Sequence, residues 1–308
     1  MDLLGKTILV PLDGSTLAEH ALPAAERIAA VLRSELLLAR VTALTLIPFE
    51  IYGGAATAEV YQQLADDDLR LANEYIVRIA ADLRGRGRQV KTMVRRGEPA
   101  STLLDIEAQS DVGLVVMTTH GRTGMVRFAL GSTADRLVRH GHVPVLLLRP
   151  EVAGQQEEDP FARVIVPLDG SPLGESSLKV VAPLAGRLLQ YVTLMRVIPA
   201  TALAAVVNEA NRYLNTVRER LSEQVAGQPC AIETLVVRGE ADEQIIEQAE
   251  AHQSMIVMAT HGLTGIRRWS YGSIADHVIH GARTAVLLVH PPLAQLPPVL
   301  AEIESGGR

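Results

Sequence analysis

The sequence predicts two tandem α/β domains, each built on a doubly wound parallel sheet of five strands. In the first half, short apolar runs alternate five times with segments of helical spacing, which is typical of repeated strand–helix units. The motif Ile8–Ser15 returns almost letter for letter as Val164–Ser171, at an offset of 156 residues, so the unit occurs twice. Aromatic residues make up only 3% of the chain. Leu, Val, Ile and Ala must therefore fill the cores, which suits buried parallel sheets.

The first elements end at positions marked by turn chemistry. Lys6–Ser15 is predicted to be a strand that runs into a turn, and Pro11 fits the end of that strand because its missing amide does no harm there. Asp13–Ser15 supplies the turn and a cap for a helix over Ala18–Leu32. Glu35–Val41 is the second strand.

The rest of the first half continues the alternation. Apolar residues at helical spacing, among them Val60, Leu64, Leu69 and Ile76, predict a long helix. The predicted elements are, in order, a loop over Thr42–Thr57 at the carboxyl edge of the sheet, a helix over Glu59–Gly85, strand Val90–Val94, helix Ala100–Ser110, strand Leu114–Met117, a helix around Ala134–Val138 and strand Val143–Leu148.

The second half repeats the order with one difference in length. Tyr191–Ile198 and Ala285–Val289 correspond to the second and fifth strands. The offset falls from 156 to 142 between Val164–Ser171 and Arg238–Glu240, so the first half carries 14 extra residues, which we assign to the loop Thr42–Thr57. The expected boundaries are a first domain over 1–150, a polar, acidic linker over 151–159, a second domain over 160–292 and a flexible tail over 293–308.

One stretch of the first half has the features of a phosphate site. The apolar strand Leu114–Met117 runs into His120–Gly124, whose two glycines indicate a turn, and Gly131–Ser132 precedes a helix. Ser132 is suited to capping the first turn of that helix. Backbone amides at a helix start, with Arg122 nearby, favour phosphate. The alternative is that these residues serve only the turn and the cap.

The same stretch returns 141 residues later with identical internal spacing. Two copies of a glycine pattern in one chain are stronger evidence than one. The phosphate candidates are therefore Gly121, Gly131 and Ser132 in the first half, and Gly262, Gly272 and Ser273 in the second.

Two acidic residues end the first strand of each half. Ligands of open parallel sheets bind outside the carboxyl ends of the strands, where the connection direction reverses. Asp13 and Asp169 would face a ligand there and could accept hydrogen bonds from ribose hydroxyls or an amino group. The alternative, that each only caps the following helix, stays open.

Composition and motif content exclude several classes of protein. The net charge is −6, without a dense basic run, which argues against nucleic-acid binding. The single Cys230 excludes an internal disulfide and a cysteine-based metal site. No His, Asp and Glu cluster has metal-ligand spacing, and neither a Walker loop nor a nucleophile elbow occurs. His120 and His261 are interpreted as structural rather than catalytic residues. No signal peptide or membrane span is expected, so we expect a cytoplasmic protein that does not bind membranes.

On these motifs the chain resembles a tandem universal stress protein over almost its whole length. The nucleotide-binding branch of that family carries Gly-x2-Gly-x9-Gly-Ser/Thr, and here Thr118 and Ala259 replace the first glycine of the pattern. The resemblance implies a Rossmann-like fold whose fifth strands pair across a domain interface. It thereby implies a pseudo-twofold monomer or a homodimer. Leu263 stands where the first half has Arg122, so we expect the first half to bind nucleotide better.

The resemblance also implies which residues would hold a nucleotide. Adenine would lie near Asp13 and Val41, ribose near Asp13 and Thr118, and phosphates on the glycine motif. The full implied set is Pro11, Asp13, Val41, Thr118, Gly121, Arg122, Gly131, Ser132 and Thr133 in the first half, and Pro167, Asp169, Val197, Ala259, Gly262, Gly272, Ser273 and Ile274 in the second.

Three functions are compatible with these residues. The first is an ATP-binding stress-response protein, with or without Mg²⁺, in which bound nucleotide sets conformation or partner choice and hydrolysis is slow at most. The second is a nucleotide-free interaction module of the same fold. The third, an adenylate-forming or phosphoryl-transfer enzyme, lacks an assembled nucleophile and base in the sequence and is the least favoured.

Overall fold

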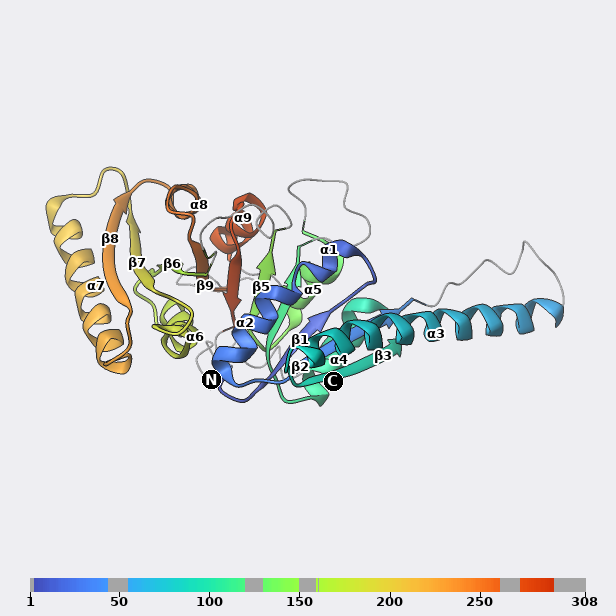
Figure 1. Ribbon diagram of the computed structural model, residues 1–308. Coiled ribbons are helices and arrows are strands. Elements are labelled where there is room, and N and C mark those ends of the chain that lie inside the picture. The colour runs from blue at the N-terminus through green and yellow to red at the C-terminus, as the bar shows by residue number, and fades with distance from the viewer. Residues whose placement is uncertain are drawn as a thin grey trace.

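The computed structural model describes residues 3–43, 55–119, 130–149, 159, 161–260 and 272–290, and gives only the backbone for 55–61. The strands and helices alternate as expected in both halves (Figure 1). The first half contains β1 (Thr7–Pro11), α1 (Thr16–Glu19), α2 (Leu22–Leu32), β2 (Leu36–Thr42), α3 (Ala55–Gly85), β3 (Val90–Arg96), α4 (Pro99–Gln109), β4 (Val112–Thr118), α5 (Ser132–His140) and β5 (Val145–Leu148). The second half contains β6 (Arg163–Pro167), the 3-10 helix η2 (Gly174–Ser177), α6 (Leu178–Leu184), β7 (Tyr191–Ile198), α7 (Ala204–Gln224), β8 (Ala231–Arg238), α8 (Ala241–Ala251), β9 (Met255–Ala259), α9 (Ser273–Gly281) and β10 (Val286–Val289).

The described strands form one continuous sheet in the order β3-β2-β1-β4-β5-β10-β9-β6-β7-β8. Neighbouring strands within each half are parallel, which confirms the predicted doubly wound domains. At the centre, β5 and β10 are antiparallel, with Leu146 opposite Leu287. The fifth strands thus pair with each other inside the chain, and the order of strands on the two sides is symmetric about that pair.

Helices cover both faces of the sheet because the strands are apolar on both sides. Along β1, Ile8 and Val10 face the layer of α2 and α3, whereas Leu9 faces the layer of α4 and α5. Each face carries one buried cluster that runs through both halves, and η2, α6 and α7 join the first layer while α8 and α9 join the second. Figure 1 shows the long helices α3 and α7 lying beside the outer strands β3 and β8.

Two predictions about the helices are wrong in part. The helix predicted over Ala18–Leu32 is divided into α1 and α2, with Pro23 in the first turn of α2. Proline has no amide hydrogen for Glu19, four residues earlier, and its ring crowds that carbonyl, so a continuous helix is excluded there.

The extra residues of the first half do not all lie in the loop. Helix α3 begins at Ala55, inside the loop predicted over Thr42–Thr57. It has 31 residues, whereas the equivalent helix α7 has 21, so the helix holds most of the extra length. The remaining part of that loop, residues 44–54, lies outside the described residues.

Candidate functional site

A cavity of about 310 Å³ lies at the carboxyl ends of β1, β2 and β4. The chain goes from β1 to β2 on one side and crosses to β4 on the other, so the connection direction reverses here. Ala39, Val41, Leu103 and Met117 supply apolar lining. Polar groups lie beside them, from Asp13, Thr118, Thr119, Ser132 and Thr133. An apolar pocket with a few polar groups is the usual form of a small-molecule site.

The loop after β1 holds Asp13 at this cavity. One carboxylate oxygen, Oδ1, accepts hydrogen bonds from the amide of Ser15 at 2.9 Å and from its hydroxyl at 2.6 Å. Ser15, in turn, caps α1 by accepting from the amide of Ala18 at 3.1 Å. The cap is therefore Ser15, whereas Asp13 orients the turn and lines the cavity. This separates the two roles that the sequence left open.

Helix α5 directs its amino terminus at the same cavity. Its N-cap is Gly131, which has φ −60° and ψ 145° and makes no side-chain cap bond. Ser132 is the first residue of the helix, so the prediction that Ser132 caps it is wrong, and Ser273 of α9 likewise follows an N-cap glycine, Gly272. A glycine N-cap leaves the first-turn amides without a capping side chain, and this arrangement suits an anion.

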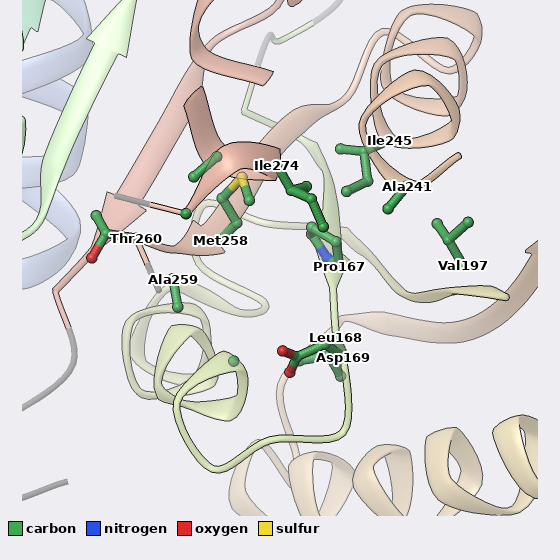
Figure 2. A pocket seen from close by; sticks show the side chains of 13 residues that line it. Pro167, Leu168, Asp169, Val197, Ala241, Ile245, Met258, Ala259, Thr260 and Ile274 are labelled. Carbon is green, nitrogen blue, oxygen red and sulfur yellow. The ribbon is translucent and has the colours of Figure 1, made fainter. Parts of the chain in front are cut away.

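The second half has an equivalent but smaller cavity of about 120 Å³ (Figure 2). Leu168, Val197, Ile245 and Met258 supply apolar lining. The side chain of Ile274, at the start of α9, points toward Pro167 in Figure 2. Thr133 occupies the equivalent position in the first half, so a branched apolar side chain replaces a hydroxyl at this point.

The loop after β6 repeats the loop after β1. Asp169 Oδ1 accepts from the amide of Ser171 at 2.9 Å and from its hydroxyl at 2.6 Å, and the Ser171 hydroxyl accepts from the amide of Gly174 at 3.0 Å. The Asp169 carboxylate lies at the edge of the second cavity (Figure 2).

Beneath each aspartate loop lies an arginine–tyrosine pair that the site predictions missed. The Arg40 guanidinium lies 4.9 Å from the centre of the Tyr75 ring, and that of Arg196 lies 5.1 Å from the centre of the Tyr213 ring. Burial, and after it Glu19, raises the pKa of Tyr75 well above its usual range, so the phenol is neutral. The repeated pairs Arg40–Val41 and Arg196–Val197 were the sequence signal for this cluster.

Each arginine packs against a glycine that adopts a left-handed backbone. Gly14 has φ +89° and Gly170 has φ +85°. A Cβ built on Gly170 would lie 2.5 Å from Nη1 of Arg196, and one on Gly14 would lie 3.1 Å from the Arg40 guanidinium. Glycine therefore allows the arginine to lie directly under the loop that holds the aspartate.

Replacing Gly170 with alanine is expected to lower the free energy of unfolding by about 1–3 kcal/mol, because it adds backbone strain and a clash with Arg196. Chemical denaturation measures the change. Gly85→Ala is the matched control, since no atom lies within 4 Å of a Cβ at that helical position. Equal stability of the Gly170→Ala variant and the wild type would contradict this account of the loop.

The structure brings most of the predicted site residues together in two groups. The first cavity is lined by Pro11, Asp13, Val41, Thr118, Gly131, Ser132 and Thr133. The second is lined by Pro167, Asp169, Val197, Ala259, Gly272 and Ile274. Ser273 does not line the second cavity, and its side chain is exposed. Gly121, Arg122 and Gly262, with His120 and His261, lie outside the described residues.

The family model described as the universal stress protein family matches the chain twice, over residues 5–149 and 160–290. The chain belongs to the universal stress protein family. A universal stress protein of Mycolicibacterium smegmatis is 26% identical over 292 residues, which cover 92% of this chain and 97% of the relative. One of Mycobacterium tuberculosis is 27% identical over 252 residues, 79% of this chain and 81% of the relative.

Similarity to solved structures agrees at the level of the fold. The crystal structure of a universal stress protein from Archaeoglobus fulgidus has a TM-score of 0.71 and 17% identity, covering 92% of this chain and 98% of that one. The chain is thus a tandem member of the family, with a family domain in each half and a role in the stress response.

Two further observations limit what the family domains contain. Among the described residues, no helix is both long enough and apolar enough to cross a membrane. Within the same residues, no group of three or more His, Cys, Asp or Glu side chains is arranged to hold a metal ion.

The apolar lining of both cavities was not predicted from the sequence. It includes Pro99 and Leu103 of α4, and Ala241 and Ile245 at the equivalent positions of α8. These helices follow the repeated Arg-Gly-Glu motif, at Arg96–Glu98 and Arg238–Glu240, which marked them as part of the duplicated unit. The motif itself makes a cap, since Glu98 accepts from the amides of Ala100 and Ser101 at the start of α4.

Proposed function

We propose that this universal stress protein binds an adenine nucleotide, ATP in the first instance, in the cavity of its first half. The observation that carries the proposal is the grouping of an apolar lining, the Asp13 carboxylate and the amino terminus of α5 around one cavity of about 310 Å³. Cavities of this size are typical of small-molecule sites.

Each part of the cavity suits one part of the nucleotide. A flat base is well accommodated between apolar side chains such as those of Val41, Leu103 and Met117. The Asp13 carboxylate accepts hydrogen bonds and therefore suits ribose hydroxyls. Phosphates suit the first turn of α5, where the helix dipole and the backbone amides favour negative charge.

We further propose that the second half contributes little binding. Its cavity of about 120 Å³ is below the usual range for small-molecule sites. Ile274 replaces the hydroxyl of Thr133 with an apolar side chain at the amino terminus of the helix. The second half would then support the fold and transmit the state of the first.

Calorimetric titration of ATP into nucleotide-free protein, with and without Mg²⁺, tests the proposal. We expect one strong site per chain, with weaker binding by inorganic triphosphate because the apolar lining would have no base to contact. Absence of heat and of saturable binding under both conditions would leave the nucleotide-free interaction module as the better function. Turnover far above that of an Asp13→Ala variant would instead support an enzyme.

The difference between the halves predicts the outcome of a reciprocal exchange. Thr133→Ile should weaken binding in the first half about tenfold, because it removes a hydroxyl and narrows the cavity. Ile274→Thr should strengthen binding in the second half, since Ile274 is 37% exposed and its loss removes little core packing. Site-resolved titration of the two variants measures both effects. Thr133→Val, which removes the hydroxyl at nearly constant volume, separates the two causes.

A further inference from the structure

Each half contributes a basic side chain to the helix of the other half. Arg149 follows β5 and His290 follows β10, at equivalent positions 141 residues apart. Arg149 Nη2 donates to the carbonyl of Ile279 in α9. His290 Nε2 lies 2.8 Å from the carbonyl of Val138 in α5. Val138 and Ile279 are also 141 residues apart, so the two contacts are reciprocal.

Both accepting carbonyls lie in the last turn of their helices. The amide of Gly141 donates to Leu137 at the end of α5, which leaves the next carbonyl, that of Val138, without an intrahelical donor. The end of a helix carries partial negative charge, and a cation there is stabilised. A charged side chain from the opposite half therefore closes the end of each helix.

The two contacts differ in how they depend on protons. Arginine is charged at all physiological pH values. The His290 ring has a second contact, because its Nδ1 lies 2.8 Å from the carbonyl oxygen of Val143, just before β5. Carbonyl oxygens only accept hydrogen bonds, and a neutral imidazole has a single N–H to donate. Both 2.8 Å contacts are hydrogen bonds only when both ring nitrogens carry a proton.

We propose that His290 is a proton-dependent clamp between the two halves, which as an imidazolium holds the end of α5 and the turn before β5 together. Loss of the proton removes one of the two hydrogen bonds and sets a nitrogen lone pair against a carbonyl lone pair. Helix α5 starts at the cavity of the first half, so the clamp anchors the far end of the helix that forms this cavity.

The sign of the pH dependence follows from this geometry. The folded chain holds the proton on His290 more tightly than the unfolded chain, in which a histidine titrates near about pH 6.5. The stability that the clamp provides is therefore complete at lower pH and is lost as the pH rises through the titration of His290 in the folded protein.

Other titratable groups surround this position and must be separated from His290. Burial raises the pKa of Glu107, although the amides of His142 and Val143 donate to it. Arg139 bonds Asp135 at 2.9 Å and lies 3.9 Å from Asp276 of the other half. The charged and titratable groups on the elements around His290 are Glu107 of α4, Asp135, Arg136, Arg139 and His140 of α5, His142 in the turn, Arg149 after β5, and Asp276, His277 and His280 of α9.

Thermal unfolding of the full chain between about pH 5.5 and 8.5, without nucleotide, tests the clamp. His290→Arg keeps a cation at every pH, as Arg149 does in the other half. We expect the Tm of the wild type to fall by about 2–4 °C more than that of His290→Arg across this range. His290→Gln, with one donor group, should resemble the high-pH wild type throughout. Parallel Tm curves for the wild type and His290→Arg would overturn the proposal.

A local measurement distinguishes the clamp from a general effect of pH. After correction for the intrinsic dependence on pH, hydrogen exchange at Arg139–Val143 should accelerate with rising pH in the wild type but not in His290→Arg. His142→Gln and His280→Gln should keep the wild-type difference, and Glu107→Gln should change the curve only at its acid end. Loss of the difference in His142→Gln or His280→Gln would assign the titration to that residue and reject His290.

Discussion

The Gly131→Trp variant is expected to bind ATP at least about 100-fold more weakly in its first half, a loss of about 2.7 kcal/mol. The indole would stand at the N-cap of α5, where the phosphates are proposed to lie. The backbone of Gly131, with φ −60° and ψ 145°, accepts any side chain, so the fold should persist. Calorimetric titration gives the affinity and the number of sites.

Two matched variants make this result specific. Gly131→Ala adds only a methyl group and should bind within a few-fold of the wild type. Gly272→Trp places the same indole in the second half, where the nearest atom to a Cβ is the Thr260 carbonyl at 3.8 Å. It should leave the strong site intact. Unchanged affinity in Gly131→Trp would show that the nucleotide does not use the end of α5.

Truncation of the central strand pair is expected to have the largest effect on stability. Leu146 and Leu287 face each other across the antiparallel β5–β10 pair and are 1% and 2% exposed. Replacing either with alanine should lower the free energy of unfolding by about 3–4 kcal/mol, because the cavity left between the two halves cannot collapse. Urea denaturation, followed by circular dichroism, measures the loss.

The double variant tests whether the two leucines act as one contact. If they pack against each other, the combined loss in Leu146→Ala/Leu287→Ala should be smaller than the sum of the single losses by at least about 0.5 kcal/mol. Leu71→Ala, at a position that is 52% exposed, serves as a control and should be nearly neutral. Additive effects of the two core substitutions would mean that the halves are held together elsewhere.

Most of the architecture was predictable because its signals are local. Apolar runs such as Ile8–Val10 and Leu114–Met117 are long enough for strands and too apolar for a surface, so they indicate strands that are covered on both faces. Repetition then turned weak motifs into strong ones. The division between α1 and α2 was also readable in Pro23, and missing it was an error of interpretation rather than a lack of signal.

The candidate site was predictable only in part. Asp13 and Gly131 belong to motifs that the chain repeats, and both line the first cavity. The apolar lining from α4 and the arginine under the aspartate loop carry ordinary core residues or a single buried charge. Which of these approach the cavity depends on how helices separated in sequence pack on the sheet. No local pattern encodes that packing.

By itself the sequence determined that this protein consists of two copies of one parallel α/β unit, and where the turns at the carboxyl ends of the strands lie. Only the tertiary structure decided that the two sheets join through antiparallel β5 and β10. It also decided that Arg149 and His290 reach reciprocal helix ends, and that the two cavities differ in size. The physical reason is that strand and turn signals act over a few residues, whereas these contacts join groups more than a hundred residues apart, whose meeting depends on the packing of the whole sheet.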